Sequence, residues 1–326
     1  MAPDRPTQAD VEELILGGEP RFTAEELAQE TGTTLGEARR IWRALGFPEY
    51  DPGAVAFTEA DAVALALVRR VVDDDVLDLD TAINLTRALG QTMSRLADWD
   101  VATLGPRIDP GVGGEDGAQQ RMASAMRLIN EVGGSFEHLI LYAWRRHLAA
   151  ALARAEALAS SDDETTTDVT VGFADLVAFT ALSNEIGEIR IGDLVEIFES
   201  RCHDVVSSQR GRVIKSLGDS VLFVVDDPIR ALDIAEGIIT VIGRDPRMPD
   251  VRIGLASGPV AMRMGDVFGP AVNMAARLTG VARRNRTIID EATAALLPED
   301  SFECRRLPAR PLRGFGLVEP IAVRRL

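Results

Sequence analysis

The stretch VTVGFADLVAFT at Val169–Thr180 decides the fold of the second half of this chain. Val169–Ala174 is typical of a short strand with apolar residues on both faces, and Asp175 follows that strand directly. Leu176–Thr180 then leads into a predicted helix, whose first backbone N–H groups point outward and attract phosphate. The segment therefore predicts a buried strand with a carboxylate and a helix start at its end.

Mixed elements follow this strand along the chain. The patterns predict helices at 189–209, 228–242 and, for the most part, 267–283, and strands at 213–217, 220–225, 251–257, 287–289 and 320–325. Gly218 and Asp219 form the turn of a hairpin between two helices. This order predicts an α+β domain of ferredoxin-like character, β-α-β-β-α-β.

The first half has a helical pattern instead. Apolar spacing predicts helices within 24–45, broken near Gly32, and at 59–72, 82–96 and 135–158, whereas the Gly-, Pro- and Asp-rich segment 105–117 predicts a loop. The polar, acidic run SSDDETTTD at 160–168 is the clearest boundary. We therefore expect an all-α domain at 1–134, a linker helix and hinge at 135–167, and an α+β domain at 168–326.

Composition and charge limit the class of protein. The chain has 326 residues, of which 46% are apolar and 26% charged, as expected for two globular domains. No run approaches 18 apolar residues and the start MAPDRPTQAD lacks signal-peptide features, so we expect a cytoplasmic protein without an integral membrane segment. Cys202 and Cys304 lack metal-type spacing. The net charge of −16, with −11 in residues 1–160, argues against nucleic-acid binding.

Two carboxylates lie where a cation could reach them. Asp175 ends a strand and Asp219 lies in a tight turn, positions that can converge outside a core. Mg²⁺ prefers one or two protein oxygens together with phosphate oxygens, so the pair predicts a metal–polyphosphate site. Taken singly, each residue is equally well explained as a turn or cap residue.

Lys215 is the only lysine in a chain that otherwise uses arginine. A lysine that donates to adenine N1 and an aspartate that accepts from the 6-amino group would select adenine, and Asp266 is a suitable aspartate. Guanine reverses both positions, and sites of this type discriminate by roughly 10⁴-fold. The alternative is a solvated strand residue and a loop residue.

Asn273 and Arg277 are four residues apart on a predicted helix, so they share one face. Their neighbours are apolar, and a buried Asn or Arg needs a partner. A ribose or phosphate could supply it, and arginine suits charge that develops on phosphorus. An internal ion pair of Arg277 with an aspartate is the alternative.

With these motifs in order, residues 168–326 resemble the catalytic domain of class III nucleotidyl cyclases. The resemblance implies an adenylate cyclase that uses two Mg²⁺ or Mn²⁺ ions per active site, because guanylate-specific relatives carry Glu and Cys at the two base-reading positions. The implied roles are metal binding by Asp175, Asp219 and the Leu176 carbonyl, substrate binding by Lys215, Asp266, Phe179, Thr180 and Arg313, and transition-state stabilisation by Asn273 and Arg277.

The resemblance also implies a mechanism and an assembly. The ribose 3′-oxygen of ATP attacks the α-phosphorus in line and pyrophosphate leaves, while Arg277 offsets charge at the α-phosphate. A head-to-tail homodimer combines the metal aspartates of one subunit with the base-reading and Asn–Arg groups of the other. Two positions depart from the family: Ala178 stands where glycine is frequent, and Arg313 where many relatives have lysine.

Residues 1–160 resemble, less specifically, the helical regulatory domain of some actinobacterial adenylate cyclases, which restrains the catalytic dimer and can confer pH sensitivity. His138 and His147 on the predicted linker helix are regulatory candidates, since histidine changes charge near neutral pH, although packing is the commoner role. A small-molecule or lipid ligand of this region stays open. Two other functions remain: a catalytically weak, cyclase-like nucleotide-binding module, and a helix-turn-helix DNA-binding regulator based on 22–45.

Overall fold

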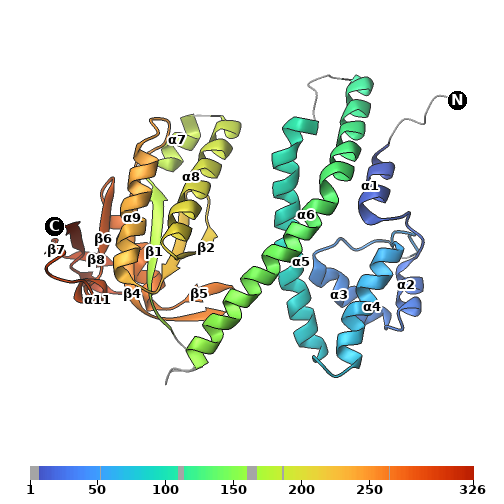
Figure 1. The fold of residues 1–326 in the computed structure, drawn as a ribbon, viewed down its shortest axis with the longest axis horizontal. Coiled ribbons are helices and arrows are strands. Elements are labelled where there is room, and N and C mark those ends of the chain that lie inside the picture. The colour runs from blue at the N-terminus through green and yellow to red at the C-terminus, as the bar shows by residue number, and fades with distance from the viewer. Residues whose placement is uncertain (1–6, 52, 109–113, 160–166, 186, 264) are drawn as a thin grey trace. The chain divides into compact units, whose positions relative to one another are not determined.

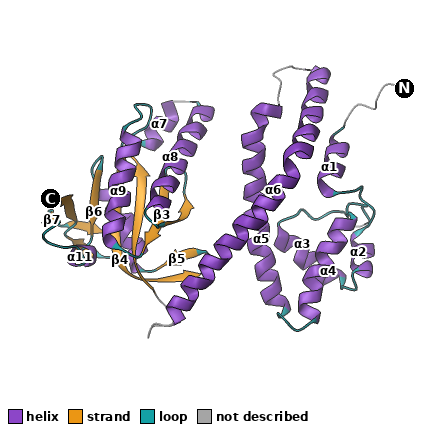
Figure 2. Ribbon diagram, in the orientation of Figure 1, coloured by secondary structure: helices purple, strands orange, loops and turns teal. Residues whose placement is uncertain are grey.

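The computed structural model describes residues 7–51, 53–108, 114–159, 167–185, 187–263 and 265–326 (Figure 1). The chain divides into two compact units, Met1–Ala150 and Ala151–Leu326, which are considered separately below. The division lies within the last turns of the long helix predicted as a linker. The all-α character of the first unit and the α+β character of the second confirm the predicted fold classes (Figure 2).

Helices make up the first unit: α1 (Gln8–Leu16), α2 (Ala24–Glu30), α3 (Leu35–Leu45), α4 (Glu59–Asp73), α5 (Leu79–Ile108) and α6 (Gly114–Ala159), which continues into the second unit. Four of them begin with a capping box, in which a threonine side chain and a carboxylate three residues later bond to each other's backbone N–H groups. The threonines are Thr7, Thr23, Thr34 and Thr58. These local bonds explain why the starts of the helices follow the sequence closely.

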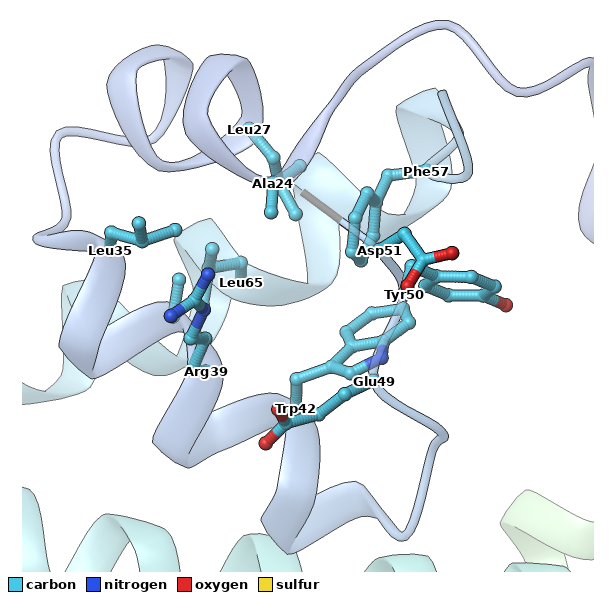
Figure 3. A pocket seen from close by; sticks show the side chains of 11 residues that line it. Ala24, Leu27, Leu35, Arg39, Trp42, Glu49, Tyr50, Asp51, Phe57 and Leu65 are labelled. Atoms are coloured by element: carbon cyan, nitrogen blue, oxygen red, sulfur yellow. The ribbon is translucent and has the colours of Figure 1, made fainter. Parts of the chain in front are cut away.

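The core of this unit lies between α2, α3, α4 and α5. Gly90 permits the close crossing of α3 and α5, because a Cβ there would lie 2.3 Å from the Leu45 carbonyl oxygen. A pocket opens beside this core, and Figure 3 shows the rings of Trp42, Tyr50 and Phe57 together on one side of it. The rings of Trp42 and Phe57 meet edge to face at 4.7 Å.

The expected loop at 105–117 is wrong for the residues that the structure describes. α5 continues to Ile108 although Pro106 lies inside it, and α6 begins at Gly114 rather than at Ser135. Pro106 lies in the last turn of α5 and lacks the backbone N–H that would bond to the preceding turn. Only Arg107 and Ile108 follow it in the helix, so the loss is small. Residues 109–113, and the boundary and hinge residues 160–166, lie outside the described residues.

The second unit follows the predicted order with additions. Its elements are β1 (Thr167–Leu176), α7 (Phe179–Glu185), α8 (Glu188–Ser208), β2 (Arg212–Ser216), β3 (Ser220–Val225), α9 (Pro228–Gly243), β4 (Val251–Arg263), β5 (Asp266–Phe268), α10 (Pro270–Val281), β6 (Arg286–Ile289), α11 (Glu291–Ala295), β7 (Phe302–Arg306), β8 (Arg310–Leu312), β9 (Gly316–Val318) and β10 (Ile321–Arg325). The sheet order is β2-β3-β1-β4-β6-β10-β7, with β5 paired to β4. Its first four strands have the antiparallel ferredoxin-like arrangement, as predicted.

Apolar side chains cover both faces of the sheet. On one face, α8 and α9 pack through Phe198, Ile234 and Ile238. On the other face, Ala275 and Leu278 of α10 pack against the sheet. Since β1 contributes Val171 to one core and Ala174 to the other, it is the buried central strand that its sequence predicts.

Two further sequence expectations concern cysteine and membranes. Cys202 is buried, Cys304 is exposed, and both are free thiols. Within the described ranges, no helix combines the length and the apolar character needed to cross a bilayer.

Candidate active site

Asp175 and Asp219 lie side by side at one end of the central strands. Asp175 is near the end of β1, where it is the register partner of Ser220 in β3 and of Arg252 in β4. Asp219 is in the turn between β2 and β3, which Gly218 makes possible with φ of +67°. The Leu176 N–H donates to the Asp219 carbonyl oxygen at 2.9 Å, and this bond holds the two segments together. The predicted convergence of the two aspartates is therefore present.

Arg252 and Ser220 bind the Asp175 carboxylate. The Arg252 Nε and Nη2 atoms lie 2.7 Å and 2.6 Å from Oδ2, and the Ser220 hydroxyl donates to Oδ1. The Asp175 side chain is 14% exposed and that of Arg252 is 32% exposed. Sequence reasoning missed both partners. The antiparallel register of β1 with β4 places Arg252 opposite Asp175, and that of β1 with β3 places Ser220 opposite it.

The charge of Asp175 acts on Asp219. Burial raises the pKa of Asp219 and the Asp175 charge raises it further, while the Arg252 guanidinium opposes them. The direction of this shift agrees with the convergence of the two carboxylates at this end of the sheet.

Two carboxylates fit a hard divalent cation that takes its remaining ligands from a nucleotide. Among the residues that the structure describes, no group of three His, Cys, Asp or Glu side chains could hold a metal by itself. Mg²⁺ and Mn²⁺ accept carboxylate oxygens and commonly retain phosphate or water ligands, so Asp175 and Asp219 suit an ion that is shared with a polyphosphate. Leu176 lies beside them at the end of β1, and the role of its carbonyl stays a prediction.

The turn after β1 has a strained backbone. Ala178 adopts φ of +59°, the left-handed conformation that glycine tolerates best. Its carbonyl oxygen accepts from the Ala181 and Leu182 N–H groups and starts α7. Phe179 and Thr180 are the first residues of α7, with Phe179 packed against the core and Thr180 exposed. The frequent glycine of the resembled family thus has a conformational explanation here.

Lys215 and Asp266 form an ion pair 51 residues apart in sequence. The Lys215 Nζ atom of β2 lies 2.5 Å from Asp266 Oδ2 at the start of β5, and their side chains are 37% and 30% exposed. Burial alone would raise the pKa of Asp266, but the hydrogen bonds from Lys215 and from the Val267 N–H leave that pKa below its ordinary value. A donor and an acceptor therefore stand next to each other at a solvent-accessible place, as the sequence predicts.

Asn273 and Arg277 lie one turn apart on α10, and both are exposed. Within the described residues, neither side chain has a hydrogen-bond or ion-pair partner. The alternative of an internal pair between Arg277 and an aspartate is therefore wrong for this part of the chain. Their shared face is available to a group from outside the subunit.

Three other candidates have positions but no tested role. Arg313 is exposed in the turn between β8 and β9, next to Gly314. His138 and His147 are exposed on α6, and the His138 Nδ1 atom lies 2.6 Å from the Gly134 carbonyl oxygen. Their substrate-binding and regulatory roles stay predictions.

Comparisons with known families divide the chain in the same way as its fold. Residues 162–321 match the adenylate and guanylate cyclase catalytic domain, and residues 5–148 match the adenylate cyclase regulatory domain.

Similar proteins cover nearly the whole chain. An adenylate cyclase of Streptomyces coelicolor is 35% identical over 97% of this chain and 89% of its own length. One of Glutamicibacter nicotianae is 34% identical over 97% and 82%. A pH-sensitive adenylate cyclase of Mycobacterium tuberculosis is 31% identical over 93% and 78%.

Solved structures resemble the second unit. The catalytic core of a rhodopsin-guanylyl cyclase with converted specificity, in complex with ATPαS, is 24% identical, with a TM-score of 0.47 over 51% of this chain and 100% of that one. The adenylyl cyclase CyaB from P. aeruginosa is 20% identical, with a TM-score of 0.45 over 49% and 94%.

Proposed function

Since the chain belongs to the adenylate and guanylate cyclase family, as an adenylate cyclase with a regulatory domain ahead of the catalytic one, we propose that it converts ATP to 3′,5′-cyclic AMP and pyrophosphate by attack of the ribose 3′-oxygen on the α-phosphate. The observation that supports this most directly is the Lys215–Asp266 pair. Its ammonium donates to adenine N1 and its carboxylate accepts from the 6-amino group. Guanine would place its N1–H donor against the Lys215 ammonium and its O6 acceptor against the Asp266 carboxylate.

Asp175 and Asp219 are the residues that would hold two Mg²⁺ or Mn²⁺ ions. Bound there, the ions would lower the pKa of the 3′-hydroxyl and neutralise the triphosphate. Ser220 orients Asp175 by donating to Oδ1, which keeps one lone pair for an ion. The turn of Ala178, Phe179 and Thr180 directs the N–H groups at the start of α7 toward the polyphosphate.

Asn273 and Arg277 stabilise the transition state, with Arg277 offsetting charge at the α-phosphate. Both side chains are exposed and have no partner among the described residues, which supports a site that two copies of the chain share in a homodimer. In that arrangement, one subunit supplies Asp175 and Asp219, and the other supplies Lys215, Asp266 and the α10 pair. Arg313 is proposed to bind the triphosphate.

The reaction is tested by incubating the full chain with ATP or GTP and Mn²⁺ and measuring both cyclic nucleotides. We expect cyclic AMP from ATP, much less cyclic GMP, and no product in EDTA. Nucleotide binding without product, in protein that is folded and dimeric, would instead support the catalytically weak module.

The shared site is tested by complementation. Asp175→Ala and Asn273→Ala are each expected to be inactive alone, because each removes one half of both sites in the homodimer. A mixture of the two variants forms heterodimers with one intact site, so activity returns. If subunits exchange, as shown by differently tagged chains, and no activity returns, the shared site is wrong.

Regulation is proposed to act through the helical domain, with pH as the candidate signal and His138 and His147 as candidate sensors. The likeness to a pH-sensitive cyclase supports this choice. The fragment 161–326 is expected to show a flatter pH–activity profile than the full chain. Profiles of the same shape would remove the sensing role from the first unit.

A further inference from the structure

Both oxygens of the Asp175 carboxylate already have donors from the same chain. Oδ2 receives two N–H groups of Arg252, at 2.7 Å and 2.6 Å, and Oδ1 receives the Ser220 hydroxyl. A carboxylate oxygen has about two lone-pair sites, so Oδ2 is saturated and Oδ1 has one site left.

The sheet holds Arg252 against Asp175. The two residues are register partners on β4 and β1, which are adjacent strands of the central sheet. The guanidinium makes one other hydrogen bond within the described residues, and it is long, with Nη1 3.5 Å from the Gly280 carbonyl oxygen. The side chain is 32% exposed, so it can leave toward solvent when another cation takes Asp175.

A divalent cation and this guanidinium exclude each other at Asp175. Mg²⁺ binds a carboxylate oxygen at about 2.1 Å through one lone pair, and both lone pairs of Oδ2 are taken by Arg252. An ion at the free site of Oδ1 would stand beside the positive charge of the guanidinium.

We propose that Arg252 is a displaceable cap that keeps free divalent cations off Asp175 until the nucleotide binds. The proposal rests on the proposed function, because it takes Asp175 as a metal ligand. With the nucleotide present, the negative charge of the triphosphate offsets the repulsion between ion and guanidinium. The metal therefore enters together with the nucleotide rather than before it.

The size of the effect follows from the charge. A neighbouring cation lowers the proton affinity of a carboxylate by roughly tenfold to a thousandfold, and a divalent ion is repelled at least as strongly as a proton. Removing the guanidinium should therefore tighten the binding of free Mn²⁺ by about tenfold or more.

The test measures Mn²⁺ binding to the nucleotide-free full chain by the loss of the free-ion signal in electron paramagnetic resonance. Arg252→Met removes the charge and the donors, and Arg252→Gln removes the charge but keeps an amide NH₂ donor on a shorter side chain. Arg286→Met is the matched control. Arg286 is the exposed register partner of Arg252 on the next strand, β6, so this substitution removes the same charge from the same part of the sheet but leaves the contacts of Asp175 intact. Thermal unfolding in EDTA identifies the variants that are folded.

We expect Arg252→Met and Arg252→Gln to bind Mn²⁺ about tenfold or more tightly than the wild type, and Arg286→Met to stay within about twofold. Adding Asp175→Asn to either Arg252 variant should abolish the gain. The proposal is overturned if the folded Arg252 variants gain no more than Arg286→Met, or if the gain survives Asp175→Asn. A variant that does not fold leaves the decision to the other.

Product formation separates this proposal from the proposed function. Wild type that makes cyclic AMP, with no gain in the Arg252 variants, rejects the cap and keeps the cyclase reaction. If Mn²⁺ binding tightens in the Arg252 variants and depends on Asp175, but the protein makes no cyclic nucleotide, then the cap at a metal site is supported and the cyclase reaction is rejected.

Discussion

Replacing Gly254 by alanine tests whether α10 must lie directly on β4 for the active site to form. Gly254 is buried in β4, and a Cβ built there would lie 2.4 Å from the Ala275 carbonyl oxygen and from the Thr279 backbone nitrogen. Both atoms belong to the backbone of α10, so no side-chain rotation can relieve the contact. The helix must move away from the strand.

The displacement and its cost can be worked out from these contacts. Since Cβ atoms do not approach other atoms within 3.0 Å, α10 has to shift by at least about 0.6 Å. Overpacking of this kind costs about 1–3 kcal/mol of unfolding free energy. The shift also carries Asn273 and Arg277 away from the sheet that holds Lys215, and misplacement by about 1 Å can cost about 10²-fold in rate.

The assay combines thermal unfolding with the rate of cyclic AMP formation at saturating ATP. Gly254→Ala is expected to unfold at a lower temperature and to lose about 10²-fold in kcat. Gly192→Ala is the matched control, because it makes the same chemical change within helix α8, where a Cβ would meet no atom within 4 Å. Alanine at that helical position should leave stability unchanged or raise it by up to about 1 kcal/mol.

A Gly254→Ala protein with the stability and kcat of the control would refute the reasoning. It would mean that α10 adapts without cost, and that the positions of Asn273 and Arg277 do not depend on this contact. If Gly254→Ala loses stability but keeps the full kcat, the packing argument holds and its link to catalysis is wrong.

Three further changes test the site. Ala178→Gly should raise the unfolding free energy by up to about 1 kcal/mol, because the left-handed backbone costs alanine about 1–2 kcal/mol and glycine's entropy returns only part of it; urea unfolding without a gain contradicts the strain. Asp219→Asn should stabilise the protein in EDTA. The raised folded-state pKa favours the neutral carboxyl, so the wild type loses stability as the pH rises through that pKa, and the advantage of the variant should disappear at about pH 4 and below in thermal unfolding. Lys215→Glu with Asp266→Cys should lower the ratio of ATP to GTP turnover by about 10²-fold or more, and an unchanged ratio would assign base selection to other residues.

Local sequence patterns predicted the structure correctly where a residue's conformation depends on its neighbours in the sequence. The capping box that starts with Thr34, the buried strand that carries Asp175 near its end and the turn at Gly218 are all set by interactions within a few residues. The loop predicted at 105–117 failed because glycine and proline weaken a helix by amounts that the rest of a long helix can offset.

The amino-acid sequence by itself determined the main order of strands and helices in the α+β unit, without its short additional elements. It also determined the separation from an all-α unit and the polar residues that follow the strands. The tertiary structure alone decided that the predicted neighbours Lys215 and Asp266 form a direct ion pair and that Arg252 binds Asp175. It also decided that Asn273 and Arg277 are exposed, with no side-chain partner among the residues that the structure describes. Strand register and the packing of α10 on β4 produce these contacts, and both depend on residues tens of positions apart. Periodicity reports which face of a strand is buried, but it carries no information about which distant residue lies opposite.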